Sequence, residues 1–155
     1  MSTLHITLAP RTMRFAVEEH TTAVPIGPAG LNADLEHDPP SPEELTNAIG
    51  LVWDHMEDVE RETPGISFVE RVEIAGEGVE AVAAVELGGA PTLPFELSRD
   101  AAEDVFRTMV TERAADRARN PGLQPDMVQP VLGVVCALVG VMRFLRVESV
   151  WLVAA

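Results

Sequence analysis

The sequence contains no lysine and no tyrosine, and it has a single cysteine among its 155 residues. A single thiol excludes an internal disulfide, and Cys136 has no neighbouring cysteine or histidine with which to form a metal site. It lies inside an apolar stretch, so we interpret it as a small buried hydrophobic residue rather than a reactive thiol. No metal and no cofactor are expected.

Long apolar segments are also missing. The longest uncharged helical stretch, residues 131–142, falls short of the roughly 20 residues that a membrane-spanning helix needs. Residues 1–10 lack the charged and apolar regions of a signal peptide. We therefore expect a cytoplasmic protein that has no membrane partner.

Positive charge is scarce as well. The chain has 25 acidic and 11 basic residues, all of the latter arginine, which gives a formal net charge of −14. A field of this sign repels nucleic acid, anionic membrane and free polyphosphate unless arginines cluster locally. We expect no nucleic-acid partner.

The hydrophobic pattern predicts one α/β domain spanning residues 1–155. Alternating apolar residues joined by short connections predict an antiparallel meander of three strands. A capping box at Ser41-Pro42-Glu43-Glu44 begins a long helix that ends near Glu62. Further helices are predicted for residues 79–87, 98–120 and 125–145, and further strands for 69–74 and 149–155. Residues 95–97 are expected only as a short extended piece.

This order, β-β-β-α-β-α-α-α-β, is similar to that of a single ribonuclease-H-like (actin-like) lobe. The expected sheet is a three-stranded antiparallel meander continued by two parallel strands, with helices on both faces. Four segments resemble the C-terminal lobe of bacterial exopolyphosphatases and guanosine-pentaphosphate phosphohydrolases. They are His37-Asp38-Pro39-Pro40-Ser41-Pro42-Glu43-Glu44-Leu45, Leu97-Ser98-Arg99-Asp100, residues 117–126 and residues 131–153.

The phosphate loops of that family are altered in this chain. Where the family has an acidic, glycine-rich loop, residues 7–14 contain neither glycine nor carboxylate, so backbone cannot approach phosphate closely and no acid anchors a metal. The second loop keeps Gly76 and Gly78, but Glu77 and Glu80 place negative charge at the following helix N-terminus. The resemblance also implies a catalytic glutamate on a preceding lobe, for which we expect no room here.

We therefore predict a non-catalytic, exopolyphosphatase-like protein with degenerate phosphate loops that acts as a structural or interaction module. The alternative is a phosphoanhydride hydrolase completed by a lobe from another chain, with magnesium as its cofactor. No catalytic residue is assigned. The residual phosphate-binding candidates are Arg11, Arg14, Gly76 and Gly78, and the loop-altering residues are Glu77 and Glu80.

Other charged groups are interpreted as structural. Four arginines at positions 107, 113, 117 and 119 are expected to form a solvated face beside acidic residues. His55 and Asp58 have helical spacing but no second ligand motif, so a metal site is not expected. The apolar terminus at residues 149–155, together with the absence of the family's last helix, predicts a homo-oligomer or a partner protein. A monomeric mass at micromolar concentration would contradict self-association.

Overall fold

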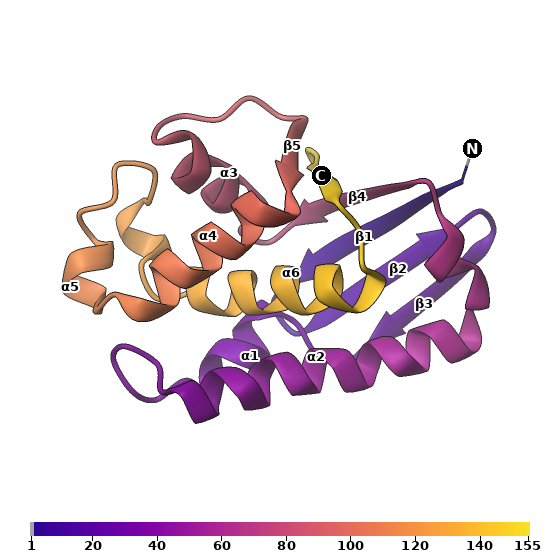
Figure 1. Cartoon of the computed structure of the whole chain (residues 1–155), viewed down its shortest axis with the longest axis horizontal. Helices are drawn as coiled ribbons and strands as arrows, with labels where there is room; N and C mark the ends of the chain where they lie inside the picture. The colour runs from indigo at the N-terminus through magenta and orange to yellow at the C-terminus, as the bar shows by residue number, and fades with distance from the viewer. Residues whose placement is uncertain (1) are drawn as a thin grey trace.

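The computed structural model describes residues 2–155, which form one six-stranded mixed sheet with its helices (Figure 1). The strand order is β3-β2-β1-β4-β6-β5. In chain order the strands are β1 (Thr3–Ala9), β2 (Thr12–Val17), β3 (His20–Val24), β4 (Arg71–Gly76), β5 (Phe95–Ser98) and β6 (Ser149–Leu152). The predicted α/β lobe is confirmed, with an antiparallel β1-β2-β3 meander continued by parallel β4 and β6.

Strand β5 was not predicted as part of the sheet. It pairs antiparallel with β6, and Leu97 lies opposite Val150 with both side chains fully buried. A four-residue strand with little alternation carries a weak sequence signal, and its pairing depends on a partner more than 50 residues away.

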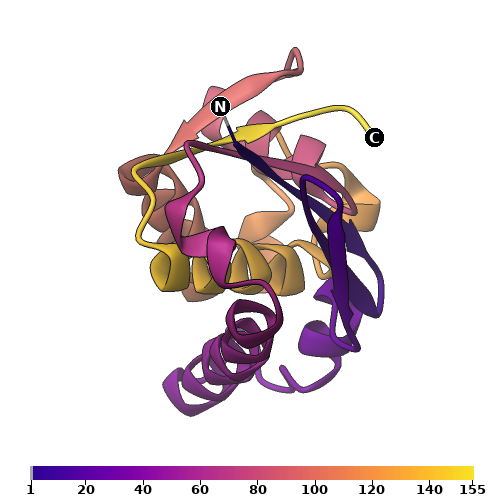
Figure 2. The same cartoon turned by 90° about the vertical axis from the view of Figure 1, so that its right-hand side faces the viewer.

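The two faces of the sheet are covered very unequally. Along β1 the side chains of Leu4, Ile6 and Leu8 are buried, whereas those of His5 and Thr7 between them are exposed. Because successive side chains of a strand point to opposite faces, this alternation directs one side of β1 into the core and the other side toward solvent. In Figure 2, α6 lies directly beneath the core face and α2 lies further out.

The helices are arranged around α6, whose residues 131–142 are all buried. Helices α1, α2 and α4 all pack against it. The helices are α1 (Pro28–Ala33), α2 (Pro42–Glu62), α3 (Val79–Leu87), α4 (Arg99–Thr111), α5 (Ala114–Arg117) and α6 (Val131–Leu145), with short 3₁₀ helices η1 (Pro64–Phe68) and η2 (Pro125–Met127). Within the described residues, no helix combines the length and hydrophobicity needed to cross a bilayer.

Two predicted helices have different bounds. The one expected over residues 98–120 is divided, because Glu112 is extended (ψ 146°) and separates α4 from the short α5. The one expected from residue 125 begins as η2, and α6 starts only at Val131. The break at residue 112 lets the chain turn back on itself, which places Arg117 in the interior.

Candidate functional site

The sheet brings together the two turns that were compared with phosphate loops in the sequence, the one after β1 and the one after β4. Since β1 and β4 are parallel neighbours, with Thr7 opposite Ala75, the β1–β2 turn and the β4–α3 turn lie at the same edge. The backbone N–H of Glu77 donates to the carbonyl of Leu8 at 2.8 Å. The carboxyl edge of parallel strands is where α/β folds usually place their ligands. This edge is therefore the candidate site.

Both glycines of the β4–α3 turn are needed for packing within the chain. Gly76 has φ +105°, and a Cβ atom there would lie 2.2 Å from the carbonyl oxygen of Leu8. Gly78 has φ +80°, and its Cβ would lie 2.3 Å from a methyl carbon of Val134 on α6. These positions require glycine whether or not a phosphate binds.

The β1–β2 turn is held by the start of α1. The carbonyl oxygen of Pro10 accepts hydrogen bonds from the N–H groups of Ala29, at 2.8 Å, and Gly30, at 3.3 Å. Donors at this helix start are thus already used by the protein itself. Arg11 in the turn and Arg14 on β2 are both exposed, and in residues 2–155 neither forms an ion pair.

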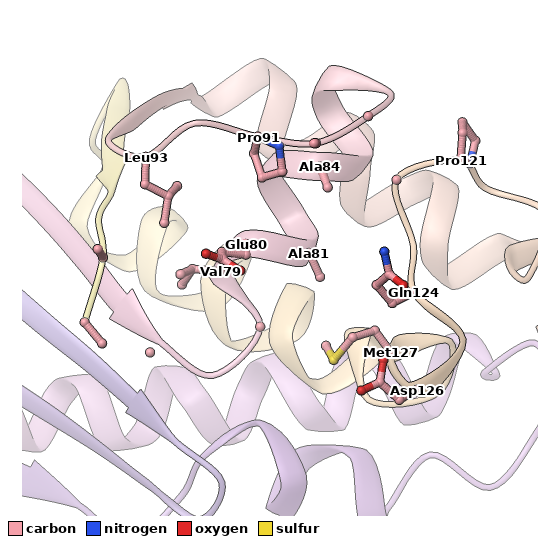
Figure 3. Close-up of a pocket in the computed structure, with 17 residues that line it drawn as sticks. Val79, Glu80, Ala81, Ala84, Pro91, Leu93, Pro121, Gln124, Asp126 and Met127 are labelled. Carbon is pink, nitrogen blue, oxygen red and sulfur yellow. The ribbon is translucent and has the colours of Figure 1, made fainter.

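A cavity of about 530 Å³ lies beside the β4–α3 turn. Figure 3 shows Val79, Glu80 and Ala81 of α3 on one side, and Gln124 and Asp126 of the segment before α6 on the other. In the part of the chain that the structure describes, the charged side chains that line it are Glu80 and Asp126, and neither Arg11 nor Arg14 reaches its wall. Carboxylates in the wall of a cavity repel a phosphate and attract a cation.

Arg117 was predicted to lie on a solvated face, and this prediction is wrong. Its side chain has an exposed fraction of 0%. The guanidinium donates to the carbonyl oxygens of Glu112 at 2.6 Å, Val128 at 2.9 Å and Met109 at 3.2 Å. It also lies 3.9 Å from the Asp38 carboxylate. Arg117 therefore joins the end of α4 to the segment before α6.

Burial lowers the pKa of the Arg117 guanidinium, while Asp38 and Glu112 oppose that shift. Arginine nevertheless remains charged at any ordinary pH. Sequence reasoning missed this role because it treated residues 98–120 as one continuous helix, on which Arg117 would face solvent. Two consecutive extended residues, Glu112 and Arg113, change the direction of the chain there.

The Asp-Pro-Pro-Ser-Pro-Glu-Glu-Leu segment also has a structural role. The Asp38 carboxylate accepts from the N–H of Ala114 at 2.8 Å, which caps α5. Glu44 completes the predicted capping box with Ser41 and also accepts from the N–H of Glu36. These hydrogen bonds, that from Ser41 foremost, lower the pKa of Glu44 to about 2. The segments that carry the resemblance thus stabilise the lobe.

Cys136 is fully buried, as predicted, and burial raises the pKa of its thiol to about 12. Such a thiol is almost entirely protonated at neutral pH and is a poor nucleophile. His55 lies on α2, and residues 2–155 contain no group of three histidine, cysteine, aspartate or glutamate side chains placed to share a metal ion.

The sheet order and the helix placement define a single lobe of the actin-like type. The fold of this chain resembles about one half of each solved structure in a group of exopolyphosphatases and related proteins. An exopolyphosphatase-like protein has a TM-score of 0.90 at 16% identity, and the match covers 98% of this chain and 55% of that one.

Two further solved structures have a similar fold over the same share of their length. The PPX-GPPA enzyme of Aquifex aeolicus has a TM-score of 0.87 at 14% identity, covering 99% of this chain and 54% of that one. An exopolyphosphatase from Cytophaga hutchinsonii has a TM-score of 0.76 at 12% identity, covering 99% and 53%. No protein-family model and no curated protein matches the sequence. The chain spans about half the length of these structures, and identities this low establish the fold alone.

Proposed function

We propose that this protein is a non-catalytic, exopolyphosphatase-like lobe that works as an interaction module. The observation that carries the proposal is the cavity beside the β4–α3 turn, where the charged lining side chains among residues 2–155 are Glu80 and Asp126. A phosphate site needs cations or free N–H donors directed at the ligand. The protein instead presents two carboxylates there.

The backbone supports the same conclusion. The N–H of Glu77 donates a hydrogen bond to the carbonyl oxygen of Leu8, and the two glycines lie so close to Leu8 and Val134 that neither position has room for a side chain. A phosphate would have to displace the hydrogen bond to Leu8 before it could accept one from the N–H of Glu77. Restoring positive charge alone would therefore leave the turn unsuited to phosphate.

A thermal-shift panel tests the proposal, using polyphosphate, guanosine tetraphosphate, ADP and inorganic phosphate, each with and without magnesium. A ligand present at 100 times its dissociation constant stabilises by about 2.7 kcal/mol, which moves the midpoint by several degrees. We expect no shift. The variant Glu77→Thr, whose side chain is exposed, should also give none. Binding by that variant would show that charge alone had removed the site, and binding by the unaltered protein would refute the proposal.

The second candidate is a phosphoanhydride hydrolase completed by a lobe from another chain. One observation favours it, since Arg11 and Arg14 are exposed and without ion pairs in the described residues, close to the edge where both loops meet. If it holds, the magnesium arm of the panel should show a shift with polyphosphate. The double substitution Arg11→Ala, Arg14→Ala should abolish that shift, whereas Arg119→Ala, an exposed arginine elsewhere, should preserve it.

A further inference from the structure

An apolar groove of about 490 Å³ runs between α2 and α4, on the side of the molecule away from the sheet. Figure 1 shows α2, α6 and α4 as neighbouring, roughly aligned helices. Residues from all three line the groove: Pro42, Leu45, Thr46, Ile49, Gly50 and Trp53 of α2, Phe106 of α4, and Arg143 of α6. It extends over about three turns of α2, roughly 17 Å at 1.5 Å per residue.

Gly50 is the least expected of these residues. It lies in the interior of α2, where glycine is less favourable than alanine. A Cβ atom there would meet nothing within 4 Å. In α6, by contrast, a Cβ at Gly133 would lie 1.9 Å from Pro28 and one at Gly140 would lie 2.7 Å from Val52. Contacts within the chain explain those two glycines but leave Gly50 unexplained.

A partner backbone packed closely against α2 would account for it. Thr46 and Gly50 are four residues apart, so they lie on one side of the helix and form a shallow notch in its surface. Small side chains at this spacing permit close approach of a second helix. Trp53 borders the notch, with an exposed fraction of 37%, and its ring packs edge-to-face against Phe144 at 4.9 Å. That contact fixes an aromatic anchor at the end of the groove.

The charge around the groove indicates what kind of helix it accepts. Arg143 is neutralised by Glu103, which accepts two hydrogen bonds of 2.8 Å from its guanidinium. Glu43, Asp54 and Glu57 lie along the outer side of α2 next to the notch, all exposed, and within residues 2–155 none of them is ion-paired. Along the α2 side of the groove, the charge without an ion pair in the described residues is therefore negative.

A second copy of this chain does not satisfy that charge. An antiparallel pair of α2 helices crossing at Gly50 would bring Glu43 of one copy toward Glu57 of the other, and each copy has a net charge of −14.

A helix with arginine or lysine beside its apolar face has the complementary charge. We propose that the α2–α4 groove binds a basic amphipathic helix of another protein. This inference rests on the proposed function, because it names the surface and the partner of the interaction module.

The test uses a synthetic amphipathic peptide with a leucine and alanine face flanked by arginines, and a matched peptide with glutamate in place of every arginine. Binding is followed by backbone chemical-shift changes in the full chain. We expect the arginine peptide to perturb residues 42–53 and Phe106 and to bind at least tenfold more tightly than the glutamate peptide. Its affinity should fall with added salt, as screening weakens charge attraction.

Gly50→Leu is the decisive variant. No atom of the chain lies within 4 Å of a Cβ at this position, so the leucine side chain should extend into the groove and leave the fold intact. The substitution should lower the affinity for the arginine peptide at least tenfold. The thermal midpoint of the variant should be no lower than that of the unaltered protein. Leu87→Ala is the matched control, since Leu87 is apolar and 56% exposed but lies on α3, away from the groove. It should leave affinity unchanged.

Any of four peptide-binding results would overturn the inference: no perturbation by the arginine peptide, equal binding of the two peptides, an unchanged affinity in Gly50→Leu, or an equal loss in Leu87→Ala. Concentration-dependent perturbation of residues 42–53 without peptide would assign the groove to a second copy and would also overturn it. Phosphate binding is not measured here, so failure of this test and failure of the proposed function can be distinguished.

Discussion

Individual residues that carry the likeness to exopolyphosphatases hold the lobe together. Asp38 caps α5 and lies 3.9 Å from Arg117, which in turn holds three backbone carbonyls. Glu44 closes the start of α2. Keeping these residues preserves a fold, and phosphate chemistry does not follow from them.

Arg117→Met should destabilise the protein by about 3–5 kcal/mol. The change leaves the carbonyl oxygens of Met109, Glu112 and Val128 without their buried, charged donor. Urea unfolding measures the loss. Arg119→Met is the matched control, because Arg119 is exposed and two residues away, and it should change stability by no more than about 0.5 kcal/mol. Equal effects of the two substitutions would refute the structural role of Arg117.

Glu44 should make the protein sensitive to acid. Its pKa in the folded protein is about 2, below its ordinary value of 4.5, so its charged form stabilises the fold above pH 4.5. That contribution is lost as the pH falls from about 4.5 toward 2, because the unfolded chain takes up the proton first. Thermal midpoints measured across this range should fall more steeply for the unaltered protein than for Glu44→Gln. Glu43→Gln, in the same helical turn, should keep the steep dependence.

At the scale of the secondary-structure elements, the β4–α3 turn shows that packing within the chain can by itself require glycine. A strand, a Gly-x-Gly turn and a helix are the usual setting for a phosphate. Here the same glycines let β4 approach β1 and let the start of α3 approach α6. A motif that indicates phosphate binding in sequence can thus be required by packing alone.

Gly78→Ala and Gly88→Ala separate these effects. Both glycines have φ +80°, so alanine is strained equally in the two backbones, but only at Gly78 would the new Cβ meet Val134. We expect Gly78→Ala to be the more destabilising by about 1–3 kcal/mol, the usual cost of overpacking. Chemical denaturation of the two variants measures this difference. Equal losses would mean that the contact with α6 does not constrain the turn.

For the molecule as a whole, the unequal covering of the sheet bears on self-association. The apolar side chains of β6 that suggested it, Val150 and Leu152, are buried in the core of the same chain. On the open face, Trp151 lies under the Arg71 guanidinium at 4.5 Å, and Arg71 is ion-paired with Glu73. Self-association stays a prediction that a mass measurement at micromolar concentration decides, and the terminal strand no longer argues for it.

Much of the fold was predictable because its signals are local. The capping box at Ser41, the alternation along β1 and the uncharged stretch in α6 each follow from residues close in sequence. The environment of Arg117 and the pairing of β5 were not predictable in this way. They depend on contacts between segments far apart in the chain, such as Asp38 with Ala114.

The sequence by itself determined the α/β lobe, the absence of glycine and carboxylate from residues 7–14, and the negative charge around the β4–α3 turn. These follow from residue type and spacing, which set hydrophobic periodicity and charge wherever the chain folds. Only the tertiary structure decided what the remaining glycines and arginines do. In the folded chain Gly76 and Gly78 lie in close packing, Arg117 is buried and Gly50 lines an open groove. The neighbours that give these residues their roles come from distant parts of the chain.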